Sequence, residues 1–576
     1  MPTLNWIGKD KVVNHHLDVP FRVLEEQYTF GDNADGNMII HGDNLDALKA
    51  LLPRFEGRVK CIYIDPPYNT GNEGWVYNDN VNDPKIRKWL GKVVGSEGED
   101  LSRHDKWLCM MYPRLKLLQK LLAEDGAIFI SIDDTEYANL KAIGDEIFGL
   151  NCFVSNISWQ RTYSTRNDSK GIVNEVEHIL VYSKTQDWQP EKLPRTAEMD
   201  EKYGNPDNDY MPWTSSDAFA ADAATHQGMV YAIQHPFTGK LIYPYNNAHW
   251  RYSQDEMLEH MRGWCPYELK DIHDEERRAS ICGISIENIR QDVKAIVLSA
   301  SVEESRKTAL SIYKRGQWPR FYFTKGGQGG IRRKTYLDNV GGKPPTNFWP
   351  YIEAGHTDEA SKEVNSIFNG KVRFDTPKPS RLIEYVLRIV GDNNAIILDS
   401  FAGSGTTAHA VLNMNKQDGG HRRFILVETE DYAENITAER VRRAITGYGE
   451  GKKAVEGTGG GFSFYELGAP LMIDGNLNPD VPEARIREYV YYTETKLPMP
   501  PASEAEPHLL GVHNRAAYYF YYLFDAVTTL NEAFLRTIRT EADSYMIYAD
   551  INALDEATMK RHHITFKKIP RDITLL

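Results

Sequence analysis

The chain of 576 residues contains 41% hydrophobic and 26% charged residues, the composition of a globular protein with room for several cores. No stretch approaches the ~20 apolar residues of a membrane span, and the first residues, MPTLNWIGKDK, lack the apolar segment of a signal peptide, so we expect a cytoplasmic protein without membrane contact. The net charge of −14 disfavours a uniformly basic nucleic-acid protein but allows a local basic face, because salt makes attraction to phosphates short-ranged.

The cysteines are few and scattered along the chain. Five are present, at positions 61, 109, 152, 265 and 282, and none forms a CxxC pair. This spacing argues against a disulfide framework and against a structural zinc site. We therefore expect buried thiols and no metal.

The first part of the chain alternates strand and helix patterns. Residues 36–64 predict a strand–helix–strand unit that ends in the apolar run VKCIYI at 59–64. A polar, glycine-interrupted stretch at 75–105 is expected to be a mobile loop. Further patterns predict a helix at 107–126, a strand at 127–134, a helix at 136–149 and strands at 153–160 and 177–184. Such alternation indicates a mainly parallel sheet covered by helices.

The middle of the chain, residues 186–370, breaks this pattern. It is rich in Trp, Tyr, Pro, His and Gly and shows few helical repeats. Between Arg306 and Leu337 there are nine Lys and Arg residues but no Asp or Glu, and aromatic residues are interleaved with them. In an acidic protein, such a segment predicts a face for a nucleic-acid backbone, with a solvated basic loop as the alternative.

The strand and helix patterns resume at residue 371. They predict a helix at 379–390, a strand at 395–400, a helix at 406–415, a strand at 422–430 and a helix at 438–445. The glycine-rich stretch GTGGG at 457–461 is expected to be a linker to a last segment, which ends at 576. Its aromatic stretch AAYYFYYLF at 516–524 is more typical of a core strand than of a stacking platform.

The loop DSFAGSGTT at 399–407 follows a predicted strand and precedes a helix. Its glycines allow a ligand to approach the backbone, but it matches neither a P-loop nor a GxGxxG dinucleotide loop. Glu428 ends the next predicted strand, a suitable place for binding ribose hydroxyls. The pattern therefore favours a nucleoside without a polyphosphate, and S-adenosylmethionine fits. Taken alone, the loop could equally be an ordinary glycine-rich turn.

The loop DPPYNT at 65–70 follows the strand at 59–64. Asp65 and the carbonyl of Pro66 could accept hydrogen bonds from an exocyclic amino group, which would stabilise positive charge on its nitrogen during methyl transfer. Pro67 restrains Pro66 to extended dihedral angles and aims that carbonyl, and Tyr68 offers a face on which a base can stack. The alternative is a proline-stiffened loop with a capping acid.

Several stretches of the chain together resemble a known family. DPPYNTG, followed by a long insert and then FAGSGTT, is similar to the DNA amino-methyltransferases of the β-type, in which the catalytic motif precedes the cofactor motif. Other stretches resemble the modification (Mod) subunits of type III restriction–modification systems: FEGRVKCIYIDPPYNTG, DGAIFISIDDTE, NCFVSNISW, FDTPKPSRLIEYVLRI and ITFKKIPRDI. The resemblance covers residues 1–185 and 340–450 well and the last part of the chain loosely.

The resemblance implies an α/β fold. We expect a Rossmann-like S-adenosylmethionine-dependent methyltransferase fold with a mainly parallel sheet, a permuted motif order, an inserted target-recognition domain and a C-terminal α+β domain. The expected boundaries are 1–185 for the catalytic half, 186–370 for the target-recognition domain, 371–456 for the cofactor-binding half and 457–576 for the accessory domain.

The family motifs also imply which residues form the sites. Asp65, Pro66, Pro67 and Tyr68 would form the catalytic loop that orients and stacks a flipped adenine. The expected cofactor contacts are Asp43, Asn44, Asp65, Lys378, Ser380, Asp399, Phe401, Ala402, Gly403, Ser404, Gly405, Thr406, Thr407 and Glu428. Asp43 could instead cap the helix at 45–55.

The DNA face is expected in the central domain, because the family carries its target domain between the two halves. The residues we expect to contact DNA are Arg315, Arg320, Lys325, Arg332, Arg333 and Lys334. The acids Asp133, Asp134 and Glu136 could suggest a metal-dependent nuclease, but without a partnering lysine motif a capping or structural role is favoured.

The resemblance therefore implies methyl transfer from S-adenosylmethionine to N6 of adenine in double-stranded DNA. The expected setting is the modification subunit of a type III-like restriction or phage-defence system, acting as a homodimer, with any restriction or helicase activity in a separate subunit. Four alternatives remain: a solitary DNA methyltransferase, cytosine-N4 transfer, an RNA or protein amino-methyltransferase, and a non-catalytic DNA-recognition subunit.

Overall fold

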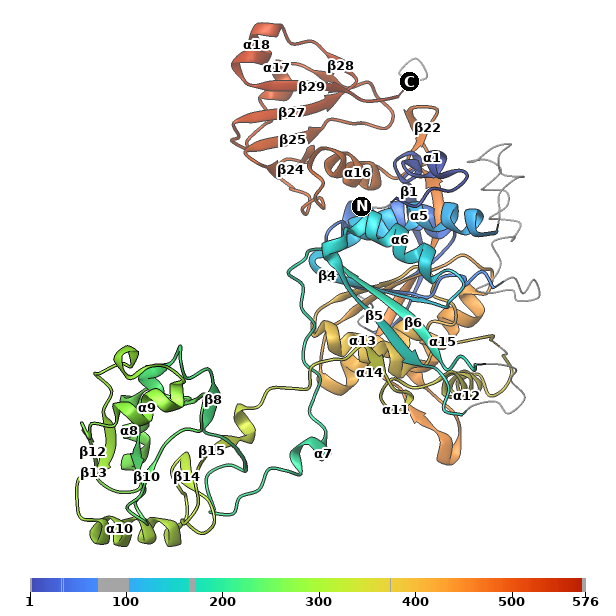
Figure 1. Ribbon diagram of the computed structural model, residues 1–576. Helices are drawn as coiled ribbons and strands as arrows, with labels where there is room; N and C mark the ends of the chain where they lie inside the picture. The colour runs from blue at the N-terminus through green and yellow to red at the C-terminus, as the bar shows by residue number, and fades with distance from the viewer. Residues whose placement is uncertain are drawn as a thin grey trace. The chain divides into compact units, whose positions relative to one another are not determined.

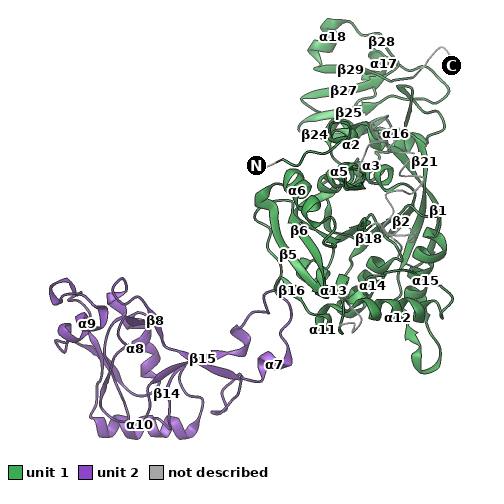
Figure 2. Ribbon diagram, turned by 45° about the vertical axis from the view of Figure 1, so that its right-hand side comes forward, with its two compact units in different colours: residues 1–191, 345–576 green, residues 192–344 purple. Residues whose placement is uncertain are grey.

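A computed structural model describes residues 3–32, 34, 36–70, 103–164, 172–372 and 374–571. Most of the loop expected at 75–105 therefore lies outside the described residues. The chain divides into two compact units (Figure 2), a large one of residues 1–191 and 345–576 and a central one of residues 192–344. Within the described ranges, no helix is long and apolar enough to cross a membrane.

The large unit is built on a ten-stranded sheet (Figure 1). Its strands lie in the order β1 (Arg22–Gly31), β21 (Gly461–Pro470), β2 (Met38–His41), β18 (Arg423–Glu428), β17 (Ile396–Asp399), β3 (Val59–Ile64), β4 (Leu122–Ile132), β6 (Val176–Ser183), β5 (Phe153–Gln160) and β16 (Phe348–Trp349). The six neighbours from β21 to β4 are parallel, whereas β1 and β6 pair antiparallel with their neighbours. The expected mainly parallel α/β fold is confirmed.

Helices cover both faces of this sheet, which explains why its central strands are apolar throughout. Side chains such as Ile62 and Ile64 of β3 pack with α3 (Asn44–Phe55), α5 (Arg103–Leu121) and α6 (Tyr137–Phe148) in one core. The other face carries α13 (Ser380–Val390) and α14 (Thr406–Asp418), with α15 (Glu439–Thr446) beyond them (Figures 1 and 2). Both predicted motif loops leave strands inside this covered layer.

Two expected boundaries in the large unit were wrong because glycines serve close packing there. Gly461 was expected to end a linker between domains, but residues 461–470 form β21, between β1 and β2 of the large sheet. A Cβ on Gly461 would lie 2.5 Å from the carbonyl oxygen of Phe30, so only glycine lets these backbones meet. The helix expected at 107–126 ends at Leu121, and Gly126 lies within β4, where a Cβ would come 2.9 Å from the Val59 carbonyl oxygen.

The central unit has its own aromatic core. One sheet contains β7 (Trp213–Asp217), β15 (Ile331–Tyr336) and β14 (Phe321–Phe323), and a second contains β10 (Leu241–Ile242), β9 (Ile233–Gln234), β13 (Ala295–Leu298) and β12 (Tyr267–Lys270). Its longer helices are α8 (Gln254–Arg262), α9 (Glu275–Cys282) and α10 (Val302–Arg315), and the core between these elements includes Trp250, Trp264 and Phe321.

The central unit is narrower than the range 186–370 expected from sequence. Residues 345–370 form β16, α11 (Tyr351–Ala354) and α12 (Thr357–Ile367), and all three belong to the large unit. β16 pairs with β5, and α11 packs on α13. The fully buried Trp349 of β16 packs against Tyr385 of α13, which anchors the returning chain to the sheet.

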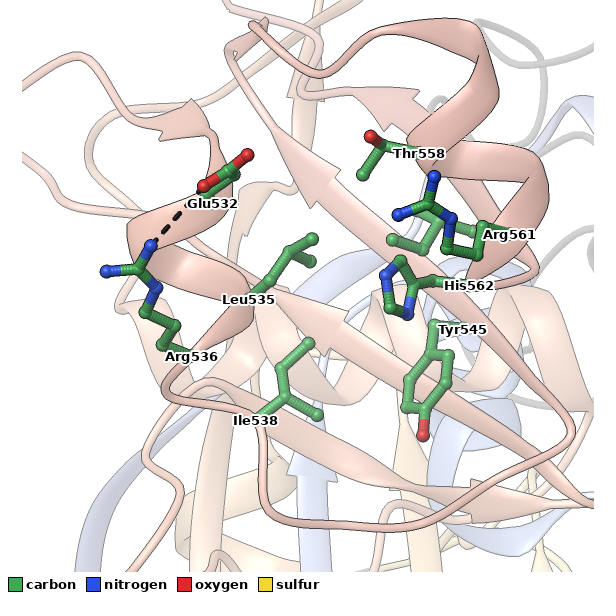
Figure 3. A pocket seen from close by; sticks show the side chains of 9 residues that line it. Glu532, Leu535, Arg536, Ile538, Tyr545, Thr558, Arg561 and His562 are labelled. Carbon is green, nitrogen blue, oxygen red and sulfur yellow. Dashed lines mark hydrogen bonds and ion pairs between the residues drawn. The ribbon is translucent and has the colours of Figure 1, made fainter.

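The last part of the chain forms a smaller α+β layer. α16 (Glu483–Thr495) packs on α3, and a sheet follows with the order β24 (Leu509–His513), β25 (Ala516–Phe520), β27 (Ser544–Ala549) and β29 (Ile564–Lys568). Tyr519, Phe520 and Tyr522 of the stretch at 516–524 are buried in the core, as expected, whereas its last residues, Leu523 and Phe524, are exposed. Between α17 (Glu532–Leu535) and α18 (Glu556–Arg561) lies a pocket with apolar Leu535 and Ile538 and basic Arg561 and His562 (Figure 3).

Candidate functional site

The two predicted motif loops meet at one edge of the sheet. β17 pairs in parallel with β3, with Leu398 opposite Ile62, and with β18 on its other side. The carboxyl ends of parallel strands lie at the same edge, where open α/β sheets bind ligands. The loops that begin at Asp65 and Asp399 are therefore neighbours, although the two residues are far apart in the chain.

Asp65 forms a buried ion pair with Lys378. The Lys378 ammonium donates to both carboxylate oxygens at 2.7 Å, and the Asp65 side chain is only 11% exposed. Burial raises the pKa of Asp65 and Lys378 opposes that shift. Burial likewise would lower the pKa of Lys378, but Asp65 and Glu177 raise it above its ordinary value, so the ammonium stays charged.

The Tyr68 hydroxyl completes this cluster. It lies 2.8 Å from an Asp65 oxygen and 3.2 Å from an oxygen of Glu177, and it accepts a hydrogen bond from Lys378 at 2.9 Å. Glu177 extends the cluster by one residue, because Arg161 donates a hydrogen bond to its other carboxylate oxygen at 2.7 Å. Five polar groups thus share one site, which we call the catalytic cluster: Asp65, Tyr68, Arg161, Glu177 and Lys378.

Hydrogen bonds from other elements also hold the DPPYNT loop in place. Trp107 of α5 donates its indole N–H to the Pro67 carbonyl at 2.6 Å. Asn69, which is fully buried and has a φ of 59°, donates to Glu136 at 2.5 Å. Glu136 is itself completely buried and also contacts His104. Pro66 is buried. That its carbonyl accepts a hydrogen bond from the substrate stays a prediction.

The remaining acids of the cluster at 133–136 have structural partners, as favoured from sequence. Asp133 accepts from the Thr135 backbone N–H at 2.8 Å. Asp134 lies 2.9 Å from Nε2 of His178. Together with the contacts of Glu136, these hydrogen bonds give each acid of the run a structural partner.

The glycine loop wraps a pocket beside the catalytic cluster. Gly403 and Gly405 have φ values of 53° and 83°, which an L side chain rarely adopts. The pocket is lined by Tyr63, Asp65, Phe374, Thr376, Pro377, Lys378, Asp399, Phe401, Ala402, Gly403, Ser404, Thr406 and Thr407. Most of the predicted cofactor residues, Asp65 among them, therefore border one cavity.

Two buried carboxyl groups support this loop. Asp399 accepts from the Thr407 hydroxyl at 2.6 Å and from the Phe401 N–H at 3.0 Å. Glu428 accepts from the Gly403 N–H at 2.7 Å. Burial raises the pKa of Asp399 to about 7 and that of Glu428 to about 8. Glu428 thus contacts the glycine loop directly, and its contact with a ribose stays a prediction.

A second buried ion pair braces the same loop. Arg440 of α15 is fully buried and donates to the Ser404 hydroxyl at 2.8 Å and the Thr406 hydroxyl at 2.9 Å. Its other nitrogen donates to Glu363 of α12 at 2.9 Å. Glu363 also accepts from the Ser380 hydroxyl at 2.7 Å. These hydrogen bonds therefore connect α12, α13 and α15 with the glycine loop.

Asp43 and Asn44, which follow β2, lie at the N-terminus of α3. The Asp43 side chain accepts from the Leu45 N–H at 2.9 Å and so caps α3, the alternative considered from sequence. Asn44 is buried and donates to the Ser400 carbonyl at 3.2 Å, which ties it to the end of β17. Contacts of either residue with a cofactor stay predictions.

Comparisons with known proteins agree with this geometry. Residues 59–439, well over half of the chain, match the family model described as DNA methylase. The chain belongs to this DNA methylase family.

Individual relatives span two kinds of system. The chain is 32% identical over 450 residues to the type III restriction-modification enzyme StyLTI Mod subunit of Salmonella typhimurium, covering 75% of this chain and 59% of that protein. It is 28% identical to the EcoPI Mod subunit of Escherichia phage P1, covering 74% and 64%. It is 30% identical to the type II methyltransferase M.KpnI of Klebsiella pneumoniae, covering 69% and 81%. The methylase chain thus spans about three fifths of the length of these Mod subunits.

The basic residues predicted to contact DNA do not all lie on a surface of this methylase. Arg315, Arg320 and Lys325 are exposed, and Arg333 is half-buried. Arg332 is 40% exposed and forms an ion pair with Asp217 at 2.8 Å. Their contacts with DNA stay predictions.

Lys334 was wrongly predicted as a DNA contact. Its side chain is completely buried, and its ammonium donates to Asp207 and Asp209, each at 2.5 Å, and to the Trp318 carbonyl at 2.7 Å. Within strand β15 Ile331 and Lys334 are buried, whereas Arg332, Arg333, Thr335 and Tyr336 are partly exposed. A run of basic residues does not reveal which member is buried.

Sequence reasoning missed several residues of the methylase site. Glu177, Arg161, Glu363 and Arg440 lie outside the recognised motifs, and Glu136 was considered only as part of an acidic run. A signal exists for Glu177 alone, because it is an acid at the start of the apolar strand stretch EHILVYSK. The other partners depend on which helices pack together.

Removing the buried charge of Lys334 should destabilise the central unit. Lys334→Met leaves Asp207 and Asp209 without their counter-ion, so we expect a loss of about 3–5 kcal/mol in unfolding free energy. Urea unfolding followed by tryptophan fluorescence measures it, because Trp213 and Trp318 border the pair. Lys314→Met, at an exposed position on α10, is the matched control. Equal midpoints for the two variants would contradict the assignment.

The stability of the ligand-free methylase should fall as pH rises through the pKa of Glu428. Burial raises this pKa from 4.5 to about 8, so the neutral carboxyl contributes stability that is complete below 4.5 and lost as pH rises through about 8. Glu428→Gln should flatten the decline in melting temperature between about pH 5 and 8, as measured by differential scanning fluorimetry. Glu450→Gln, at an exposed carboxylate, should leave the decline unchanged.

Proposed function

We propose that this chain transfers a methyl group from S-adenosylmethionine to N6 of an adenine flipped out of double-stranded DNA. The observation that carries the proposal is the adjacency of β3 and β17, which puts the Asp65 carboxylate in the wall of the pocket formed by the glycine loop. A methyl donor in that pocket and a base on the DPPY loop would meet at Asp65. Membership of the DNA methylase family supports the same chemistry.

The pocket residues fit S-adenosylmethionine. The left-handed glycines Gly403 and Gly405 leave room for a ligand against the backbone, and the buried Glu428 lies at the end of the strand next to the loop. The expected holders are the loop from Phe401 to Thr407 for the methionine part and Glu428 for the ribose. The cofactor supplies a methyl group already activated by positive sulfur, so the chain needs no nucleophile of its own.

The catalytic loop would receive the amino group of the base. Asp65 can accept one N–H of the amino group and stabilise the positive charge that develops on its nitrogen. The Pro66 carbonyl is the second acceptor, and the Tyr68 ring is the stacking face that helps to offset the few kcal/mol of base flipping. An acid in the first position of the motif favours adenine over cytosine-N4.

The setting we favour is the modification subunit of a type III-like system, supported by the Mod relatives. Its partners would be double-stranded DNA at the exposed basic residues of the central unit, a second copy of the chain, and a separate restriction subunit. The rival is a methyltransferase that works alone. M.KpnI favours it, because the chain spans 81% of that protein but only 59% of the StyLTI Mod subunit.

Asp65 should be required for methylation but not for DNA binding. DNA from cells expressing the wild-type chain is expected to carry N6-methyladenine at one sequence motif, detected by modification-sensitive sequencing. Asp65→Ala should remove this mark, while binding to a duplex containing the motif stays within a few-fold in a gel-shift assay. Transfer of labelled methyl groups to RNA or protein but not to DNA would refute the proposal, and methylcytosine at the motif would favour the N4 alternative.

Arg440 should set the affinity for S-adenosylmethionine. Arg440→Met removes charged hydrogen bonds of about 1.5–3 kcal/mol each, so we expect a dissociation constant raised about 10- to 100-fold. Arg440→Lys keeps the charge and should lose less. Isothermal titration measures the affinity, and Arg443→Met, on the same helix but in contact with Glu439 and the Ile367 carbonyl, is the control. An unchanged affinity in Arg440→Met would refute the idea that Arg440 holds the glycine loop in the shape that binds the cofactor.

A further inference from the structure

Lys378 occupies the positions that the substrate needs. Its ammonium donates at 2.7 Å to both oxygens of Asp65 and at 2.9 Å to the Tyr68 hydroxyl. Asp65 is the carboxylate that would accept from the amino group of the flipped base, and Tyr68 is the residue on which that base would stack. The ammonium therefore stands in for a substrate amino group, and the base and the lysine compete for one carboxylate.

The competition matters for the chemistry as well as for space. Methyl transfer places positive charge on the amino nitrogen, and Asp65 stabilises it with its negative charge. A lysine at 2.7 Å neutralises that negative charge in a buried site, where charges interact strongly. The reaction therefore requires Lys378 to leave Asp65, and a buried ammonium can leave only to another acceptor.

Glu177 is that acceptor. Its nearer oxygen lies 3.6 Å from the Lys378 nitrogen, beyond a short hydrogen bond but within ion-pair distance, and its side chain is only 7% exposed. Burial would raise the pKa of Glu177, but Lys378 and Arg161 lower it, so the group is an ionised carboxylate. The lysine side chain is flexible enough to close this gap while its backbone stays in place.

The Tyr68 hydroxyl is placed to serve both arrangements. It has one proton and lies within donating distance of Asp65, at 2.8 Å, and of Glu177, at 3.2 Å. Arg161, 2.7 Å from the far oxygen of Glu177, fixes the direction of that carboxylate. In either arrangement two carboxylates, one ammonium and one guanidinium remain together, so the handover leaves the net charge of the site unchanged.

We propose that Glu177 is a positioning residue that takes Lys378 from Asp65 when the target base enters, and so frees Asp65 for the amino group. Glu177 itself touches neither the base nor the cofactor. The inference rests on the proposed function and assigns to it a step that the motifs do not contain. Without Glu177, the lysine would stay on Asp65 and compete with every incoming base.

The test compares Glu177→Gln with Glu175→Gln, a change at an acid two residues earlier that lies outside the catalytic cluster. The substrate is a duplex carrying the motif that sequencing finds for the wild-type chain. We expect Glu177→Gln to keep its affinity for S-adenosylmethionine within about twofold and its melting temperature near that of the wild type. Its single-turnover methylation rate should fall about 10- to 100-fold, as misplaced catalytic groups do. Glu175→Gln should methylate at the wild-type rate.

Each other outcome has a definite meaning. A wild-type rate in Glu177→Gln overturns the handover, and parallel losses of rate, cofactor affinity and melting temperature would make Glu177 merely structural. If Glu177→Gln does not fold, Glu177→Asp decides, because it keeps the charge for Arg161 but withdraws the carboxylate from Lys378. Glu177→Asp should lower the methylation rate while the affinity for the cofactor stays unchanged. A wild-type rate in this variant refutes the positioning role of Glu177. If the wild-type chain methylates no DNA, the proposed function fails instead.

Discussion

The ion pair between Asp65 and Lys378 joins the two halves of the methylase. The partners are 313 residues apart in the chain, and the central unit lies between them in sequence. A buried carboxylate and a buried ammonium are each costly alone and acceptable only together. Neither half can therefore bury its motif without the other, and the parallel pairing of β17 with β3 supplies the contact that brings the two charges to one edge of the sheet.

The segments that flank the central unit contribute to the site. Before the chain enters that unit it passes Arg161, which directs Glu177, and after it returns it forms α12, whose Glu363 holds Ser380 and Arg440. One connection thus contributes to the catalytic cluster, and the other contributes to the hydrogen bonds that hold the glycine loop. The segments on either side of the inserted unit are therefore part of the structure that supports the site.

Most of the sheet and both loops could be predicted, because the information is local. An apolar strand followed by DPPY or by a glycine loop specifies the strand, its carboxyl end and the residues exposed there. β21 was missed because its glycines resemble a linker, whereas Gly461 is required by the close approach of the Phe30 carbonyl. Glu177, Glu363 and Arg440 were missed because their partners are set by packing between elements that are distant in the chain.

The two buried lysines, Lys334 and Lys378, show why the role of a charged residue cannot be predicted from its charge alone. Lys334 and Lys378 each have two acidic neighbours and almost no exposure. Around Lys334 both carboxylates lie at 2.5 Å and a backbone carbonyl completes the set, so nothing is left to move. Around Lys378 the distances are unequal, 2.7 Å and 3.6 Å, and the site opens to the pocket beside Asp65. A symmetric, sealed arrangement fixes a fold, whereas an asymmetric one next to a cavity leaves the ammonium a second place to go.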